Sequence, residues 1–155
     1  MRRRFQNPKY VRLSISKSLL IFLVIIAGIG FVDSTYLTVE HYTNSNPPCF
    51  IGSCELVLTS SYSTFAGIPV ALSGMAYYLF ILVALLIFFE SKKEMALRIG
   101  LFSTTIGFIV SIYLFFLQAS VIHAFCQYCL GSAATSTILF IAALCVILKS
   151  RRTLP

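Results

Sequence analysis

The sequence predicts an all-α integral membrane protein: a bundle of four transmembrane helices, with a polar loop and a short half-helix between the first two. Hydrophobic residues make up 58% of the chain and charged residues only 11%, against roughly 25% charged residues in a typical soluble domain. Two stretches, 56–89 and 99–148, contain no Asp, Glu, Lys or Arg. A membrane-crossing helix needs about 20 apolar residues, so the second stretch is long enough for two crossings joined by a turn.

The positions of the basic residues predict how the bundle is oriented. All twelve Lys and Arg fall within residues 2–17, 92–98 and 149–152. If four helices cross the membrane, these three groups lie on the same side, and the positive-inside rule places both termini in the cytoplasm. We therefore expect a multi-pass protein of the cell membrane. The net charge of +7 reflects this topology and does not predict nucleic-acid binding.

The order of elements follows from these patterns. Residues 1–17 form a basic cytoplasmic segment near anionic lipid, and residues 149–155 form a cytoplasmic tail. The membrane domain covers residues 18–148, with helices expected at about 18–37, 70–89, 99–120 and 126–148. Between the first two helices, Pro47 and Pro48 exclude a helix interior. Residues 53–59 then read as a short half-helix lying on the membrane surface.

Cys126 and Cys129 form a Cys-x-x-Cys motif where the last helix is predicted to begin. Side chains three residues apart share a face of a helix, so the two thiols can close a short disulfide ring. Backbone donors and the dipole at a helix N-terminus lower a cysteine pKa, and the thiolate is the reactive form in disulfide exchange. The predicted location is extracytoplasmic, where disulfides persist. The motif therefore favours a redox-active pair over a zinc half-site.

A second pair, Cys49 and Cys54, lies in the loop on the same predicted side. We expect Gly52 between them to let the loop bring the two sulfurs together or apart. Three interpretations remain open: a redox pair, a structural disulfide, and a four-thiolate metal site shared with Cys126 and Cys129. The first predicts a thiol oxidoreductase. The other two predict a non-enzymatic membrane module.

Two ionisable residues on the outer side are candidates for proton relay or ligand contact. Asp33 lies near the outer end of the first helix, and an ionisable group at that depth is a functional-site candidate by default. His123 precedes Cys126 by three residues. Each also has a simpler interpretation, as a residue that hydrogen-bonds at the interface or at a helix turn. Aromatic residues of the helices either line a flat, apolar pocket for a quinone or only pack the bundle: Tyr77, Tyr78, Phe80, Tyr113, Phe115 and Phe116.

These residues together resemble the vitamin K epoxide reductase family. The matching pattern consists of Cys49, residues 54–63, 67–69, Gly74, 77–78, Cys126 and Cys129. In the first helix, Asp33-Ser34-x-Tyr36-Leu37-Thr38 with His41 is similar to the bacterial and archaeal branch. The resemblance extends over residues 18–148.

The resemblance implies a route for two electrons and no metal. In that scheme Cys129 lies nearest to a membrane quinone, of menaquinone or ubiquinone type, and donates to it. Cys126 exchanges with Cys54, and Cys49 is the thiol that a thioredoxin-like partner attacks. Ser60 helps to shape the loop helix, which covers the active site as a lid.

The chain also departs from some members of that family. Some homologues carry a thioredoxin-like domain on the same chain, whereas this one ends at Pro155, so we expect a separate extracytoplasmic partner. Vertebrate enzymes have a tyrosine where this chain has Ala133, and an asparagine where it has Val70. We therefore expect reduction of a plain quinone, coupled to disulfide formation in exported proteins, rather than reduction of vitamin K epoxide.

Overall fold

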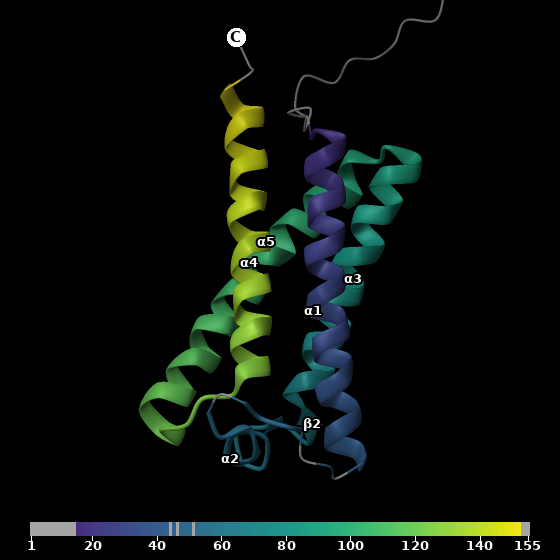
Figure 1. Cartoon of the computed structure of the whole chain (residues 1–155). Helices are drawn as coiled ribbons and strands as arrows, with labels where there is room; N and C mark the ends of the chain where they lie inside the picture. Colours follow the sequence, from purple (N-terminus) through teal and green to yellow (C-terminus); the bar gives the residue numbers. More distant parts are fainter. Residues whose placement is uncertain (1–14, 44, 46, 51, 153–155) are drawn as a thin grey trace, which may run out of the picture.

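The computed structural model describes residues 15–43, 45, 47–50 and 52–152 and shows a bundle of four long helices (Figure 1). These are α1 (Lys17–Thr43), α3 (Val70–Ser91), α4 (Glu94–Leu117) and α5 (Gln127–Arg152), with a π-helical turn, η1 (Gln118–Ile122), continuing α4. Both α1 and α4 pack against α3 and α5, which closes the bundle. The predicted all-α, four-helix fold is confirmed.

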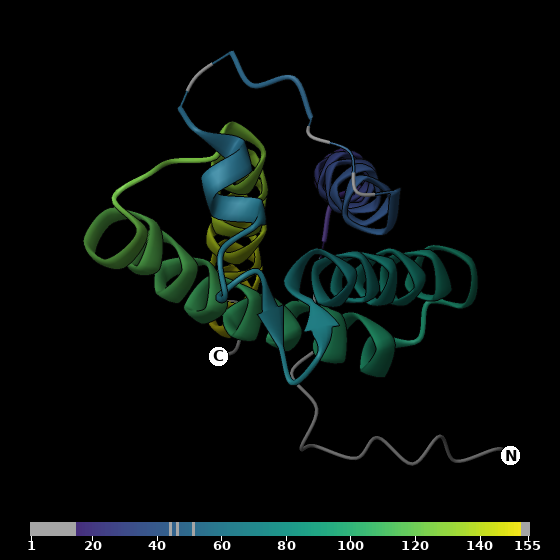
Figure 2. The same ribbon diagram turned by 90° about the horizontal axis from the view of Figure 1, so that it is seen from below.

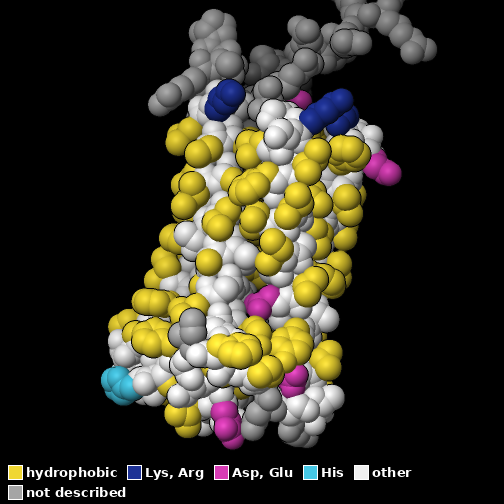
Figure 3. All heavy atoms as spheres, in the orientation of Figure 1, with side chains coloured by type: hydrophobic (Ala, Val, Ile, Leu, Met, Phe, Trp, Pro, Cys, Tyr) yellow, Lys and Arg dark blue, Asp and Glu magenta, His cyan; other side chains and the backbone are white. Residues whose placement is uncertain are grey.

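The outer surface of the bundle is apolar along its length. Large side chains such as Ile25, Phe102 and Ile109 are 55%, 72% and 61% exposed. Hydrophobic side chains cover the visible face between the two ends, and the Lys and Arg side chains gather at one end (Figure 3). A helix that is apolar all round belongs in a core or a membrane. Four helices are long and apolar enough to cross a bilayer, at Lys17–Thr43, Val70–Ser91, Glu94–Ile122 and Gln127–Ser150, so this is a multi-pass membrane protein.

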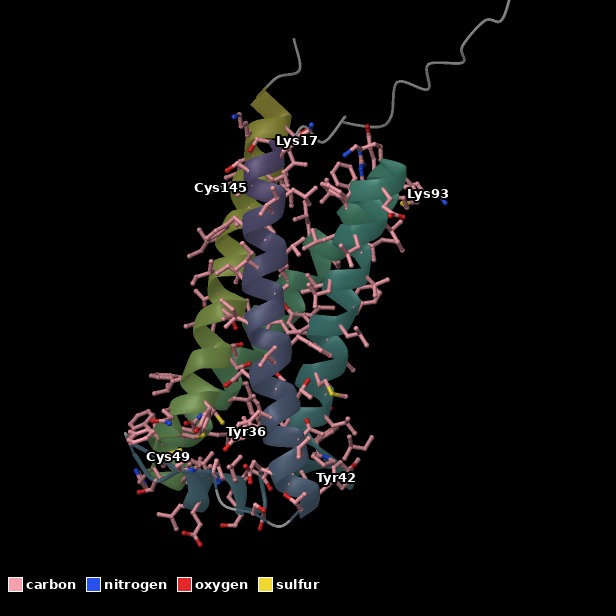
Figure 4. The ribbon with its side chains drawn as sticks, turned by 45° about the vertical axis from the view of Figure 1, so that its right-hand side comes forward. Lys17, Tyr36, Tyr42, Cys49, Lys93 and Cys145 are labelled. Atoms are coloured by element: carbon pink, nitrogen blue, oxygen red, sulfur yellow. A yellow bond between two sulfur atoms is a disulfide. The ribbon has the colours of Figure 1, made fainter. Side chains whose placement is uncertain are left out.

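The two ends of the bundle differ in their residues. One end carries Lys17 and Lys93, and the opposite end carries Cys49 and Tyr42 (Figure 4). We call these the lysine end and the cysteine end. At the lysine end, only residues 92 and 93 separate α3 from α4.

The turn at the lysine end is stabilised locally. Lys92 adopts a left-handed conformation (φ 53°), and its backbone N–H donates to the Phe88 carbonyl oxygen at 3.0 Å. Its ammonium group lies 5.6 Å and 5.2 Å from the ring centres of Phe88 and Phe89, within the range of a cation–π contact. Glu94 places a negative charge in the first turn of α4, where the helix dipole favours it.

The helices are longer than their sequence patterns indicated. The first continues past residue 37 to Thr43, the third begins at Glu94 rather than 99, and the last continues past residue 148 to Arg152. Hydropathy marks the part of a helix that is immersed in lipid, but a helix continues until its backbone conformation changes. Most of the basic N-terminal segment, residues 1–14, and residues 153–155 of the predicted tail lie outside the described residues.

A small substructure lies across the cysteine end (Figure 2). It consists of α2 (Cys54–Leu58) and a two-stranded hairpin, β1 (Thr64–Phe65) and β2 (Ile68–Pro69), and we call it the lid. The hairpin turns through two residues of positive φ, Ala66 at 51° and Gly67 at 80°, as in a type I′ turn. The predicted short helix is present, whereas the hairpin was not predicted.

The main apolar core fills the lysine half of the bundle. Each long helix contributes to it through buried side chains: Leu20, Leu23, Ala27, Tyr78, Ile81, Leu85, Phe88, Leu97, Leu101, Leu139, Ala143 and Val146. The cysteine half is therefore free to be built differently.

Candidate active site

The loop cysteines are joined in a disulfide at the start of the lid. Cys49 and Cys54 have their Cα atoms 5.8 Å apart, and Cys54 is the first residue of α2. Cys54 is fully buried and Cys49 is partly exposed. The disulfide uses two of the four thiolates that a shared metal site with Cys126 and Cys129 would need.

The residues that lead into the lid are attached by backbone contacts to the segment just before α5. Gly52 pairs with Cys126 in an isolated antiparallel bridge, and the Ser53 N–H donates to the Phe125 carbonyl oxygen at 2.9 Å. Gly52 has φ of 90°, and a Cβ atom on it would overlap the Phe125 carbonyl oxygen. We expected this glycine to provide flexibility. The structure shows that Gly52 also provides positive φ and close backbone approach, and its flexibility stays a prediction.

The two residues inside the Cys-x-x-Cys motif also hold the loop. Gln127 accepts a hydrogen bond from the Phe50 N–H at 3.1 Å. The Tyr128 hydroxyl donates to the Pro48 carbonyl oxygen at 3.0 Å. These contacts flank Cys49 on both sides, so the motif positions the loop cysteine as well as supplying thiols.

The two pairs come together in one buried cluster. Cys54 and Cys126 are both fully buried there, with Cys49 and Cys129 packed against them. The Cys126 N–H donates to the side-chain oxygen of Gln118 at 2.9 Å. A hydrogen bond from the Cys129 side chain lowers the pKa of Cys126 below its ordinary value, against the opposing effect of burial.

A cavity of about 330 Å³ lies beneath the lid, between the four long helices. Cys129 forms part of its wall, whereas Cys126 does not. Val57 and Leu58 of α2 close the end of the cavity, and the rest of its lining is mostly apolar. This volume falls at the lower end of the range for small-molecule pockets. The arrangement gives a flat, apolar ligand access to one thiol of the pair.

The remaining predicted site residues lie at different distances from this cavity. The Ser60 hydroxyl donates to the Val57 carbonyl oxygen at 2.7 Å, at the end of α2, and Ser60 lines the cavity. Asp33 is outside the lining, and one of its oxygens is buried without a hydrogen-bond partner among the described residues. His123 is exposed at the end of η1, also outside the lining.

Three of the six aromatic candidates line the cavity, and three face outward. Tyr77, Tyr78 and Phe115 belong to the lining. Phe115 is nevertheless 49% exposed, about as much as the three that are outside the lining: Phe80, Tyr113 and Phe116. Sequence inspection could not separate the two groups, because all six lie on uniformly apolar helices.

Two further polar residues were not anticipated. Gln118 is 3% exposed and holds the backbone of Cys126 across the π-helical turn. Ser136 is 2% exposed and lines the cavity on α5. A π-helical turn is often found at functional sites, but its occurrence has no simple sequence signal.

The fold and site define a membrane protein with two adjacent cysteine pairs, one of which borders an intramembrane cavity. The model of the vitamin K epoxide reductase family matches residues 21–144. This range includes both cysteine pairs, the lid and most of each long helix. The chain belongs to this family, and it is therefore a membrane oxidoreductase of the thiol- and quinone-dependent type.

Proposed function

We propose that this chain carries two electrons from a thioredoxin-like partner to a membrane quinone, in support of disulfide formation in exported proteins. Cys49 and Cys54 receive the electrons, and Cys126 and Cys129 pass them to the quinone. The observation that carries the proposal is the single buried cluster that contains both pairs, with Cys129 in the cavity wall. A staple with no redox role has no need of that contact.

The relay consists of a quinone reduction followed by thiol–disulfide exchanges. The Cys126 and Cys129 thiols lose two electrons and two protons to the quinone, which becomes a hydroquinone while their disulfide forms. A reduced partner dithiol opens the Cys49–Cys54 disulfide and leaves as a disulfide. The Cys54 thiolate then attacks the Cys126 sulfur and displaces Cys129, after which Cys49 displaces Cys126 and restores the loop disulfide. The net reaction converts partner dithiol and quinone to partner disulfide and hydroquinone.

Exposure supports the order of the first step. Cys49 is the more accessible sulfur of the loop disulfide, while Cys54 is fully buried against Cys126. An external dithiol therefore reaches Cys49 first, and Cys54 is left to exchange internally. The positive-inside rule places this end on the extracytoplasmic side, where such partners act on exported proteins.

The cavity lining supports a plain quinone as acceptor. Val70 and Ala133, which stand where vertebrate enzymes have asparagine and tyrosine, both line the cavity. Their small apolar side chains offer no hydrogen bond at those two positions. Both candidate proton carriers lie outside the cavity lining. Asp33 has a buried carboxylate oxygen without a hydrogen-bond partner among the described residues, whereas His123 is exposed.

Redox trapping tests the relay. In Cys129→Ala the Cys126 thiolate can attack the Cys54 sulfur of the loop disulfide and displace Cys49, but it has no partner thiol with which to complete the exchange. The variant, purified without reductant, should therefore hold a Cys54–Cys126 bridge beside a free Cys49 thiol, visible by mass spectrometry after non-reducing digestion. Quinone reduction should fall by about a thousandfold or more, as for loss of an essential catalytic group. Cys145→Ala is the matched control, because Cys145 is an exposed free thiol on the same helix outside the site. A free Cys126 beside a permanent Cys49–Cys54 disulfide would exclude the relay.

A further inference from the structure

The cavity wall contains two hydroxyl groups that have no hydrogen-bond partner among the described residues. They are Tyr77 Oη on α3 and Ser136 Oγ on α5, both enclosed and both in the lining. A buried hydroxyl without a partner costs free energy. Such groups in a native structure call for an explanation, and their position in a cavity points to a ligand that accepts hydrogen bonds.

The hydroxyl of the neighbouring tyrosine, Tyr78, does have hydrogen-bond partners. The Tyr78 hydroxyl donates to the Ser132 carbonyl oxygen at 2.7 Å and lies 2.8 Å from Thr135 Oγ1. The fold thus satisfies one tyrosine hydroxyl on α3 fully and leaves the next one, Tyr77, without a partner beside Gly107 of α4, which is also a residue of the cavity lining.

Helix α4 leaves room for the Tyr77 hydroxyl. Tyr77 lies against Gly107, where a Cβ atom would overlap the hydroxyl oxygen. Its ring also packs edge-on against Tyr78, with ring centres 5.0 Å apart and an interplanar angle of 67°. The ring is therefore fixed by its neighbours, and the unsatisfied hydroxyl is held in place.

The two hydroxyls can act on the same ligand atom. Tyr77 and Ser136 lie near each other, without the geometry of a hydrogen bond between them. Even if they rotated to bond to each other, one O–H donor would remain free. In the described part of the chain the cavity lining holds no Lys or Arg, and His41 is its one histidine. A neutral acceptor such as a carbonyl oxygen therefore fits this pair better than a carboxylate does.

The position of the pair relative to Cys129 indicates the orientation of the ligand. Ser136 follows Cys129 by seven residues on α5, which is two turns or about 10 Å along the same face. A quinone carries its two carbonyl groups on opposite edges of a flat ring. We propose that the hydroxyls of Tyr77 and Ser136 bind the quinone carbonyl farther from Cys129, so that the other edge of the ring faces the thiol. This inference rests on the proposed quinone reduction and adds the atoms that hold the ring.

Infrared spectroscopy of bound quinone tests the contact directly. The probe is a short-chain naphthoquinone labelled with ¹³C at one carbonyl, added to the purified full-length protein. We expect one carbonyl stretch of the bound quinone to lie at lower frequency than in apolar solvent. In the double variant Tyr77→Phe, Ser136→Ala that stretch should return toward the solvent value, and the Kd should rise about tenfold, the cost of a typical hydrogen bond.

The control applies the same chemical change outside the cavity. Tyr113 is 58% exposed on α4 and does not line the cavity, so Tyr113→Phe should leave both the band and the Kd unchanged. An unshifted carbonyl band in the wild type, an unchanged Kd in the double variant, or an equal rise in Tyr113→Phe would each overturn the assignment.

Failure of this inference is distinguishable from failure of the relay. Binding and the infrared band need no electron transfer. A wild-type protein that shifts the carbonyl band but never forms the Cys54–Cys126 bridge would retain the quinone site and lose the relay. A protein that forms the Cys54–Cys126 bridge but leaves the carbonyl band unshifted would retain the relay and lose the proposed contact with Tyr77 and Ser136.

Discussion

The lysine end and the cysteine end of the bundle are built from the same four helices but are packed in opposite ways. At the lysine end, Leu23, Leu97 and Leu139 are at most 1% exposed and fill the interior. At the cysteine end, the helices present small residues such as Gly107 and Ser136, and a cavity of about 330 Å³ remains. On α5 the change takes place within one turn, between Ser136 and Leu139.

This difference separates stability from ligand binding within one fold. Protein interiors are normally close-packed, and unfilled space lowers the free energy of unfolding. The cysteine half gives up that contribution in order to hold a ligand, and the lysine half provides the stability that holds the helices around it. Substitutions in the two halves should therefore affect different measurements.

The largest expected contrast is between Leu139→Ala and Ala133→Leu, which lie on the same helix on either side of the boundary. Leu139→Ala opens a void in packed core and should lower the free energy of unfolding by about 2–5 kcal/mol. Ala133→Leu extends into existing space, so stability should change by no more than about 1 kcal/mol. Quinone binding should show the reverse order: Ala133→Leu weakens it by about tenfold or more, because the added atoms occupy the cavity.

Thermal unfolding in lipid nanodiscs and quinone titration measure the two effects. Equal losses of stability in both variants would mean that the cavity is filled by the protein itself when free of ligand, and that the two halves do not differ.

A smaller effect is expected from Gly52→Ala at the attachment of the lid. Alanine at φ of 90° is strained, and its Cβ would overlap the Phe125 carbonyl oxygen, so we expect a loss of about 1–3 kcal/mol. The Cys126 thiol should become more reactive toward maleimides as the lid separates from it. Gly28→Ala is the control: it has open space in α1, and alanine should stabilise that helix by up to about 1 kcal/mol. Unchanged Cys126 reactivity in Gly52→Ala would show that other contacts hold the lid.

Adjacent tyrosines should respond in opposite directions when their hydroxyls are removed. Without quinone, Tyr78→Phe should lower stability by about 1 kcal/mol, because it deletes hydrogen bonds to α5. Tyr77→Phe should raise stability by up to about 1 kcal/mol, because it removes a hydroxyl that is buried without a partner. Unfolding of the two variants in quinone-depleted lipid measures both. A loss of stability in both would indicate that Tyr77 has a protein partner.

The smallest effect concerns the ionisation of Cys126. The hydrogen bond from Cys129 lowers the pKa of Cys126, so the thiolate forms at lower pH than in an ordinary cysteine. Cys129→Ala removes that bond, and the Cys126 pKa should rise. Both proteins are first reduced, because Cys126 of the variant would otherwise be held in a disulfide with Cys54. At neutral pH the reduced variant then holds less thiolate, and its rate of alkylation by iodoacetamide, read at Cys126 by mass spectrometry, should increase only at higher pH. Identical pH profiles in the two proteins would assign the low pKa to the backbone alone.

Features that depend on the residues within a single helix could be predicted from the sequence. Two long uncharged stretches were enough to predict three crossings, and the apolar residues 18–37, with Asp33 as their one charge, predicted the fourth. The spacing of Cys126 and Cys129 was enough to predict a pair of adjacent thiols. Contacts between distant segments were not predictable. Gln118 reaches the Cys126 N–H only because α4 ends in a π-helical turn, and nothing in the local pattern requires that turn.

The two tyrosines illustrate the same limit more sharply. Tyr77 and Tyr78 are identical neighbours in the sequence, yet Tyr78 packs against Gly30 of α1 and Tyr77 against Gly107 of α4. The Tyr78 hydroxyl meets the polar groups of α5, and the Tyr77 hydroxyl is enclosed beside Gly107 of α4 without a partner. The difference comes from helix packing, which single-helix periodicity does not contain.

The bridge between Gly52 and Cys126 also constrains the order of events during biosynthesis. The two residues are 74 positions apart, whereas the disulfide of the lid spans only five. At a synthesis rate of about 5–20 residues per second, the lid precedes its docking surface by roughly 4–15 s. During that interval the loop cysteines of a nascent chain are complete and uncovered. A loop disulfide that forms in that interval forms before Cys126 is present to bury Cys54.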